Sequence, residues 1–451
     1  MLSGPKLKRS EELNTVVISW RVQFGVFELN LRERELRKFG LRVKLQQKPF
    51  QILHRLLETP GEFVSREELA RVLWPDLHVL VDRSLNTAVN ALRRALGDEG
   101  RNPRFVESRQ GLGYRFIAQV EQVQTGTAAP GVRTQKRGTE AHRDYLKGRY
   151  FSNKLTTEDL HRSVAHFESA LARDPEYALA YTGLADTYIQ FAFQGMLPAQ
   201  ECFGRAKKFA EAALQINDRL AEAHTSHAGV KRYCEWDWSG AEAAYRRALE
   251  LNAEDARAHR LYADYLSAMG RSGEALSEIG TAQELDPLSL IVNMEMAWIL
   301  YVARDFQAAA EQSWKTLAME PRFAPAQNTL GLAYQQMGMI EEAIVELDNA
   351  RECSGGHPAA QAALAHALAI AGRRSEAEDL LTQLSRASHV SRYWLAIVNT
   401  ALGASDAAFE SLQQAYENRE PWLVWLNVEP RYDPLRGNAR FDYLSRRVAG
   451  V

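Results

Sequence analysis

Residues that end helices recur at a nearly constant spacing through the second two thirds of this 451-residue chain. The recurring sites are Asp174-Pro175, Asn217-Asp218, Asn252, Asp286-Pro287 and Glu320-Pro321, at intervals of 43, 35, 34 and 34 residues. A fixed period of this length indicates one structural unit used repeatedly, which buries its apolar face against its neighbours. The longer first interval predicts an insertion near Gly195–Ala199, in the segment GMLPA.

Small residues occupy equivalent positions in successive units. Gly183-Leu184-Ala185 and Ala263-Asp264-Tyr265 fall in the first helix of a unit, and Glu274-Ala275 and Glu342-Ala343 fall in the second. Small side chains let two helices approach closely. A period near 34 with two helices per unit is the tetratricopeptide spacing, and it predicts seven or eight units over residues 140–445. Such an array forms a curved solenoid whose concave face suits a protein or peptide partner.

The first 125 residues mix strands and helices. The predicted strands are 22–29, 35–39, 41–45, 104–107 and 114–118, and the predicted helices are 50–58, 66–74 and 82–96. Ser65-Arg66-Glu67-Glu68 is a capping box that starts the second helix. Residues 121–139 are polar and rich in Gly and Thr, which predicts a flexible linker. The expected order is a tail (1–20), an α+β domain (21–120), a linker (121–139) and an all-α tetratricopeptide solenoid (140–445).

The predicted helix 82–96 has two contrasting sides. Its apolar stripe consists of Leu85, Val89, Leu92 and Leu96, which we expect to face the domain core. The opposite side displays Arg83, Asn86, Thr87, Asn90 and Arg94, with Ala91 beside them and Arg93 flanking. In a DNA major groove, Asn pairs with an adenine edge and Arg with guanine or phosphate. An ordinary solvated amphipathic helix has the same pattern, so the helix alone leaves both interpretations open.

The hairpin after this helix favours nucleic acid. Arg109 and Arg115 flank Gly111-Leu112-Gly113, and glycine lets such a tip approach a phosphate backbone or a minor groove. Residues 1–125 contain 21 Lys and Arg against 15 Asp and Glu, whereas the remainder contains 34 against 42. Residues 1–125 are therefore basic and the remainder is acidic, which predicts that only residues 1–125 approach a polyanion.

Residues 22–120 resemble the OmpR/PhoB-type winged helix-turn-helix, the C-terminal effector domain of many bacterial response regulators. The resemblance rests on Trp74-Pro75, Val81-Asp82-Arg83-Ser84, Leu92-Arg93-Arg94-Ala95-Leu96 and Gly111-Leu112-Gly113-Tyr114-Arg115-Phe116. It implies a recognition helix in the major groove and a hairpin, the wing, on the minor groove or backbone. The expected DNA-binding residues are Trp74, Arg83, Ser84, Asn86, Thr87, Asn90, Ala91, Arg93, Arg94, Ser108, Arg109, Gln110 and Arg115.

The chain departs from this family in ways that bear on its input. Asn90, Ala91 and Gln110 stand where many members place Arg, so the docking mode transfers but the sequence preference does not. Only about 20 residues precede the winged domain, so we expect no phosphoacceptor domain as the switch. The run ALGDEGRNPRFVESRQGLGYRF resembles CadC-like regulators, which usually have a transmembrane helix after this domain. The polar residues 121–139 instead predict a cytoplasmic protein without a membrane anchor.

The tail of the repeats also resembles that of bacterial winged-helix regulators. In the tail PWLVWLNVEPRYDPLRGNARFDYL, Trp422, Trp425, Pro430 and Phe441 are expected to cap the last repeat. Plain core packing of these aromatic residues at the end of the array is the alternative, and it is the favoured one. No HExxH, P-loop or GxSxG motif is present, so we expect no enzyme activity. The three cysteines are far apart and near no His/Cys cluster, so we expect no metal site, disulfide framework or cofactor.

The sequence therefore predicts a sequence-specific, double-stranded DNA-binding transcriptional regulator whose repeats bind a partner or signal. RNA polymerase, and a second copy of the chain on DNA, are also expected partners. The alternative is a protein-interaction scaffold whose winged domain no longer binds DNA. That alternative stays open because Asn90, Ala91 and Gln110 stand where many members of the family have Arg.

Overall fold

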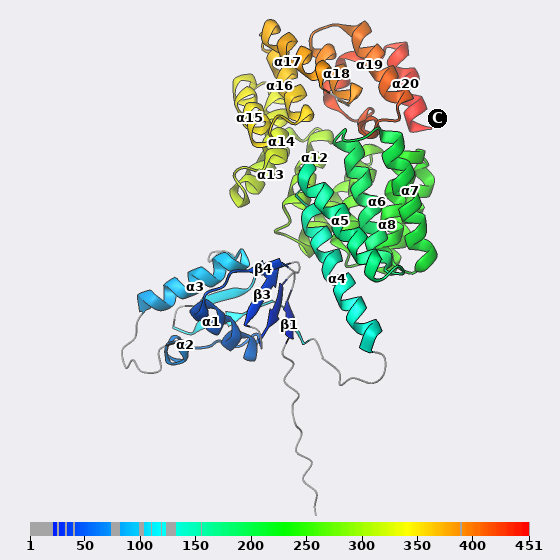
Figure 1. The fold of residues 1–451 in the computed structure, drawn as a ribbon. Coiled ribbons are helices and arrows are strands. Elements are labelled where there is room, and N and C mark those ends of the chain that lie inside the picture. Colours follow the sequence, from blue (N-terminus) through cyan, green and yellow to red (C-terminus); the bar gives the residue numbers. More distant parts are fainter. Residues whose placement is uncertain are drawn as a thin grey trace, which may run out of the picture. The chain divides into compact units, whose positions relative to one another are not determined.

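The computed structural model describes residues 21–24, 27–31, 34–38, 41–73, 82–98, 103–109, 111–118, 120–122, 132–154, 156–387 and 390–450. The chain divides into two compact units, Met1–Lys136 and Arg137–Val451. We call the first the winged unit and the second the helical unit (Figure 1). No helix within the described ranges is long and apolar enough to cross a membrane.

The winged unit combines a sheet, three helices and a hairpin. Its elements are β1 (Arg21–Phe24), β2 (Phe27–Asn30), β3 (Glu35–Lys38), β4 (Leu41–Val43), α1 (Gln47–Glu58), α2 (Arg66–Leu73), α3 (Asp82–Leu96), β5 (Val106–Arg109), β6 (Gly113–Phe116) and β7 (Glu121–Gln122). The antiparallel sheet has the order β4-β3-β2-β1-β7, and β5 pairs with β6 to form the wing. The three predicted helices and the hairpin at 35–45 are confirmed.

Two strand predictions in this unit were wrong in detail. The single strand expected over 22–29 is two strands, and Phe24 and Phe27 at their ends are both buried with rings 5.5 Å apart. The wing strands expected at 104–107 and 114–118 lie instead at β5 and β6. The amides of Arg104 and Phe105 donate to the Asp98 carboxylate at 2.6 and 3.3 Å, so they are not available to the β5–β6 ladder.

The expected capping box is present in part. The Ser65 hydroxyl accepts from the Glu68 amide at 3.1 Å, as predicted. The Glu68 carboxylate binds Arg55 of α1 (Nε to Oε1, 2.9 Å), so it joins the first two helices instead of reaching back to the cap.

The prediction of a flexible linker over 121–139 differs from the structure at both ends of that range. Residues 121–122 form β7, which pairs with β1 through backbone groups that no side-chain pattern reveals. The helix α4 begins at Val132, inside the range expected to be flexible. Residues 123–131 lie outside the described part of the chain.

The helical unit consists of consecutive helix pairs. Its helices are α4 (Val132–Ser152), α5 (Thr157–Arg173), α6 (Ala178–Phe193), α7 (Ala199–Ile216), α8 (Ala221–Val230), the π-helix η1 (Lys231–Glu235), α9 (Trp238–Leu251), α10 (Ala256–Ala268), α11 (Ser272–Leu285), α12 (Leu290–Val302), α13 (Phe306–Met319), α14 (Ala324–Gln336), α15 (Ile340–Cys353), α16 (Pro358–Ile370), α17 (Arg374–Arg386), α18 (Arg392–Ala401), α19 (Ser405–Glu417), the 3-10 helices η2 (Pro421–Trp425) and η3 (Pro430–Leu435), and α20 (Ala439–Ala449). Among the described residues, α4 to α19 make eight consecutive helix pairs.

The predicted helix ends and small-residue contacts are confirmed. The C-caps are Asp174, Asn217, Asn252, Asp286 and Glu320, as the sequence spacing predicted. A Cβ on Gly183 would lie 2.4 Å from the Phe167 ring, and one on Gly331 would lie 2.6 Å from Leu347. Only glycine lets α6 come this close to α5 of the preceding pair, and α14 to its partner α15.

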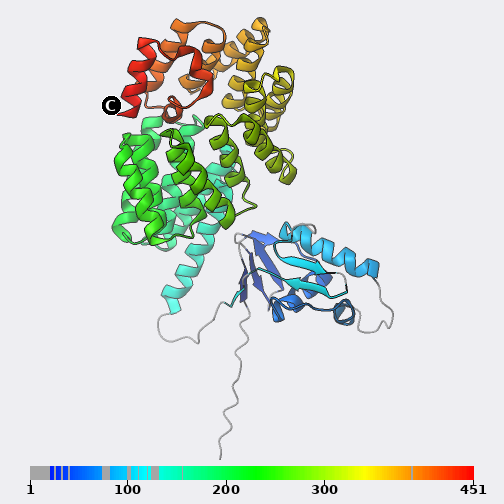
Figure 2. The same ribbon diagram turned by 180° about the vertical axis from the view of Figure 1, so that it is seen from behind.

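The C-terminal residues 420–450, here named the return segment, pack back onto the early pairs. In Figures 1 and 2, the C-terminal end of α20 lies next to the green helices, and the Trp238 indole at the start of α9 donates to the Val448 carbonyl at 2.9 Å. The Trp422 indole donates to the Phe193 carbonyl at 3.2 Å, and Trp425 packs edge-on against Trp298 of α12. These two tryptophans therefore reach beyond the last repeat that they were expected to cap, and they cover part of the surface formed by the first helices of the early pairs.

Candidate nucleic-acid interface

Helix α3 has one buried side and one exposed side. Leu85, Val89, Leu92 and Leu96 are at most 1% exposed and belong to the core of the winged unit. That anchoring turns Asn86, Thr87, Asn90 and Arg94 outward, and all four are exposed. The predicted stripe is therefore confirmed, and the polar face opposite it is exposed.

The remaining expected contact residues differ in exposure. Ser108 and Arg109 on β5 are exposed, whereas Ser84, Ala91, Arg93 and Arg115 are partly buried. Arg83 lies in α3, but its side chain is outside the described residues. Trp74 and Gln110 also lie outside the described residues.

Three side chains connect α3 to the wing and to α2. The Tyr114 hydroxyl donates to Asn86 Oδ1 at 2.9 Å and accepts from Arg66 Nη1 at 2.8 Å. Arg66 Nη2 also donates to Asn86 Oδ1 at 2.9 Å. Because two donors hold this oxygen, the amide of Asn86 is fixed with its NH₂ group as the part left for a ligand. A bidentate contact with adenine needs the oxygen as well.

Asn90 lies one turn further along the same face and differs from Asn86. Its side chain makes no hydrogen bond with any other described residue, although its backbone carbonyl accepts from Arg94 Nε at 3.4 Å. Both the donor and the acceptor of the Asn90 amide are therefore free for a base edge.

Arg93 and Asp98 attach the end of α3 to the wing. Arg93 donates to the Val106 carbonyl from Nη2 at 2.8 Å and from Nε at 3.3 Å. Asp98 is 7% exposed and accepts from three successive backbone amides, the last that of Val106 at 2.8 Å. These bonds fix the wing relative to the helix, so part of the Arg93 guanidinium is used inside the domain.

The two arginines of the wing have different surroundings. Arg115 forms an ion pair with Glu107 on the neighbouring strand and stacks on Phe63, with its guanidinium carbon 4.6 Å from the ring centre. Arg109 is exposed and makes no side-chain hydrogen bond or ion pair within the described residues. Of the two, Arg109 is the one that can neutralise a phosphate without breaking an existing contact.

Gly113 fixes the wing against the segment between α1 and α2. Val64 and Tyr114 exchange backbone hydrogen bonds of 2.8 and 3.0 Å, and Gly113 has φ of +110°. A Cβ at this position would lie 2.1 Å from the Val64 carbonyl oxygen. The wing sits this close to the helix-turn-helix only because residue 113 has no side chain.

Sequence reasoning missed Arg66, Asp98 and Tyr114. Tyr114 and Asp98 lay inside the motif runs that supported the family resemblance, but no local pattern shows which distant groups they bind. The signal that was available is their polarity: each is a polar residue beside a helix or strand end, where backbone and side-chain donors need partners.

Comparison with known families and curated proteins identifies the winged unit. Residues 40–116 match the family described as "Transcriptional regulatory protein, C terminal". Regulatory protein VirG of Agrobacterium tumefaciens is 35% identical over 107 residues, 24% of this chain and 40% of VirG. Sensory transduction protein BceR of Halalkalibacterium halodurans is 36% identical over 72 residues, 16% of this chain and 31% of BceR. The chain thus spans less than half the length of these relatives.

Among solved structures, the DNA-binding domain of Klebsiella pneumoniae RstA in complex with the RstA box is 26% identical. The match covers 22% of this chain and 96% of that one, with a TM-score of 0.21. Pseudomonas aeruginosa PilF is 21% identical, covering 46% of this chain and 92% of its own, with a TM-score of 0.35. The family match identifies residues 40–116 as an OmpR/PhoB-type domain, the C-terminal domain of transcriptional regulatory proteins. The arrangement of the helices that follow is that of a tetratricopeptide-type array, so the chain carries both.

Proposed function

We propose that this protein is a sequence-specific, double-stranded DNA-binding transcriptional regulator. The observation that carries the proposal is the exposed polar face of α3, which a buried apolar stripe holds outward beside the wing. An α-helix fits the major groove, and the wing then reaches the flanking minor groove or backbone. The helical unit serves as the module for a partner or signal. A cytoplasmic location, pairing on DNA and contact with RNA polymerase remain part of this proposal.

The different contacts of Asn86 and Asn90 on α3 give these two asparagines different proposed roles in base recognition. Asn90 offers both amide groups and is proposed to bind the N6 and N7 edge of one adenine. Asn86 can only donate, so it donates to a purine N7 or a thymine O4 without choosing adenine. We therefore propose an operator with one strongly preferred A·T pair opposite Asn90 and a more tolerant neighbour opposite Asn86.

Selection of random duplex DNA by the full-length chain tests this function. We expect a short motif with one dominant A·T position. In Asn90→Ala that position loses ~1–3 kcal/mol of discrimination, about 5- to 150-fold in affinity ratio, because the bidentate contact is gone. Enrichment of one motif by both proteins at equal strength would contradict the assignment of Asn90. If neither protein retains DNA at low salt, the scaffold alternative is favoured.

The salt dependence of binding separates Arg109 from Arg93. We expect Arg109→Ala to lower the slope of log affinity against log salt by ~1, because one phosphate contact is lost. Arg93→Ala is expected to leave that slope unchanged and to lower the stability of the wing, because Arg93 is bonded to the Val106 carbonyl. Fluorescence anisotropy over a range of salt measures the slope.

Arg42 supplies the matched control, since it is an exposed arginine on β4. Arg42→Ala removes the same charge and should leave the slope as it is. If Arg42→Ala and Arg109→Ala change the slope equally, net charge rather than docking of the wing explains the affinity.

A further inference from the structure

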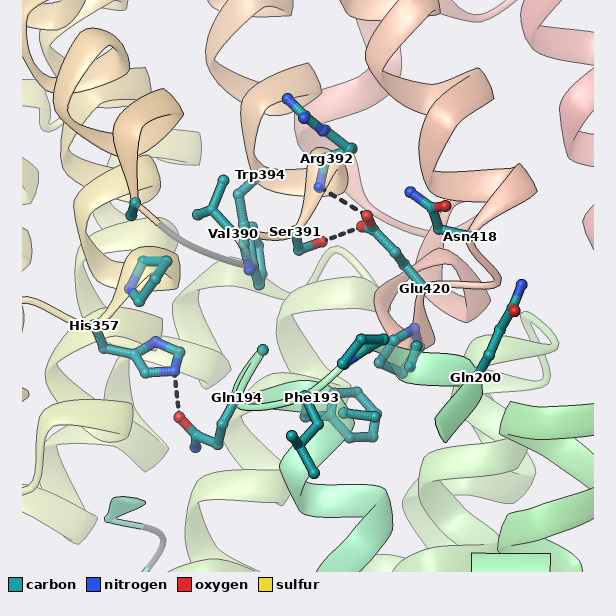
Figure 3. Close-up of a pocket in the computed structure, with 18 of the residues that line it drawn as sticks. Phe193, Gln194, Gln200, His357, Val390, Ser391, Arg392, Trp394, Asn418 and Glu420 are labelled. Atoms are coloured by element: carbon teal, nitrogen blue, oxygen red, sulfur yellow. Dashed lines mark hydrogen bonds between the residues drawn. The ribbon is translucent and has the colours of Figure 1, made fainter. Parts of the chain in front are cut away.

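The helical unit contains a cavity of about 420 Å³ where early and late helices meet. One wall is the loop between α6 and α7, which includes the insertion GMLPA that breaks the repeat period. The other walls come from the start of α16, the ends of α17 and α19, the start of α18, and η2. The insertion that breaks the repeat period thus lines this cavity (Figure 3).

One carboxylate in this cavity is largely buried, and its hydrogen bonds come from uncharged donors. Glu420 is 9% exposed, and among the described residues it forms no ion pair. It accepts from the Ser391 hydroxyl at 2.5 Å, from the Arg392 amide at 3.1 Å and from the Tyr393 amide at 3.3 Å. Burial raises the pKa of the Glu420 carboxyl, an indication that its negative charge is costly there.

Among the described residues that line the cavity, Arg392 carries a positive charge that lowers the pKa of Glu420, but this effect is smaller than that of burial. In Figure 3 the Arg392 side chain points away from the Glu420 carboxylate. His357 Nδ1 accepts from the Ala359 amide at 3.2 Å, so Nε2 carries the proton and donates to Gln194 Oε1 at 2.6 Å. Burial lowers the pKa of His357, which keeps this imidazole neutral at neutral pH.

Aromatic rings form the remaining wall. Phe193 and Trp394 both line the cavity, and each packs against Trp422, with ring centres 4.9 and 4.6 Å apart respectively. Aromatic faces attract ammonium groups, and this attraction strengthens when water is excluded. A cavity lined by one carboxylate and two aromatic rings is therefore complementary to an organic cation.

We propose that this cavity binds a small organic cation, with its ammonium group against the Glu420 carboxylate and its carbon skeleton against Phe193 and Trp394. The carboxylate retains acceptor capacity, since a carboxylate offers about four lone-pair sites and three are in use. A bound cation would touch residues of α6 and of α18 to η2 at once. It would therefore join the beginning of the array to its end, independently of whether the winged unit binds DNA.

Titration calorimetry of the full-length chain with three probes of matched size tests the proposal. The probes are benzylammonium, benzyl alcohol and benzoate. We expect saturable binding of one benzylammonium per chain, at least ~10-fold tighter than that of benzyl alcohol, and still weaker binding of benzoate. Equal affinity for the cation and the alcohol, tighter binding of benzoate, or no saturable binding of benzylammonium would overturn the proposal.

Variants then assign the charge to Glu420. Glu420→Gln should reduce benzylammonium binding to the level of benzyl alcohol, whereas Glu417→Gln, which removes an exposed carboxylate nearby, should change nothing. Unchanged affinity in a folded Glu420→Gln variant would contradict the proposal. If Glu420→Gln does not fold, Ser391→Ala decides: it removes a donor but keeps the carboxylate, so benzylammonium should bind more tightly, and weaker binding would be the contrary result.

Discussion

The Gly113→Ala variant is expected to unfold the winged unit while the helical unit stays folded. The new methyl group would overlap the Val64 carbonyl oxygen at 2.1 Å, and the φ of +110° lies where residues with a side chain are strained. Neither backbone can yield, because Val64 and Tyr114 are bonded to each other in both directions. We expect a loss of at least ~3 kcal/mol, a large part of the stability of a domain of this size.

Hydrogen exchange measures this effect where it occurs. The Tyr114 amide, which donates to the Val64 carbonyl at 3.0 Å, should lose its protection in Gly113→Ala, whereas the amides of α10 to α15 should keep theirs. Gly111 is the matched control, since it also has positive φ (+79°) but a Cβ there meets nothing within 4 Å. Gly111→Ala should cost only ~1–2 kcal/mol. Similar exchange in the two variants would show that φ alone, and not the close approach, constrains Gly113.

The second large effect is expected from Glu429→Ala in the helical unit. Glu429 is fully buried and accepts from Arg431 Nε at 2.9 Å and Nη2 at 2.8 Å, and from the Tyr301 hydroxyl at 3.1 Å. Arg431 is 3% exposed, so removal of the carboxylate leaves a guanidinium in the interior without a counter-charge. We expect a loss of ~3–5 kcal/mol, measured by urea unfolding followed by far-ultraviolet circular dichroism.

The double variant Glu429→Leu with Arg431→Met separates the charge effect from the loss of contacts. Replacing both members of a buried pair by apolar groups is often nearly neutral, so the double variant should recover most of the stability. If it is as unstable as Glu429→Ala, the bond from Tyr301 and the packing of η3 carry the effect. Glu410→Ala, at an exposed position of α19, should leave the midpoint unchanged.

Features that depend on neighbouring residues were predictable from the sequence. Asp174, Asn217, Asn252, Asp286 and Glu320 end helices because each occupies a C-cap whose geometry is set within one turn. The apolar stripe of α3 was equally local, since helical spacing alone decides which side is buried. The exposed face of the candidate site follows directly from that stripe.

Features that depend on distant partners were not predictable. Asn86 and Tyr114 are 28 residues apart, and Arg93 and Val106 are 13 apart, so their hydrogen bonds exist only after the wing has packed on α3. The return segment shows the same limit. The repeat period indicates how adjacent pairs stack, but the tail after α19 has no period. Its contacts with α6, α9 and α12 therefore had no signal in the sequence.

The return segment also sets the timing of folding during synthesis. Tyr301, Trp238 and Phe193 meet partners that follow 128, 210 and 229 residues later. At a translation rate of about 5–20 residues per second, the surface around Phe193 waits roughly ten to fifty seconds for Trp422. A nascent chain can stack its early pairs on the ribosome, but it leaves an aromatic surface uncovered until residues 420–450 have been made. We therefore expect the early pairs to be most exposed to aggregation and proteolysis before the return segment emerges from the exit tunnel.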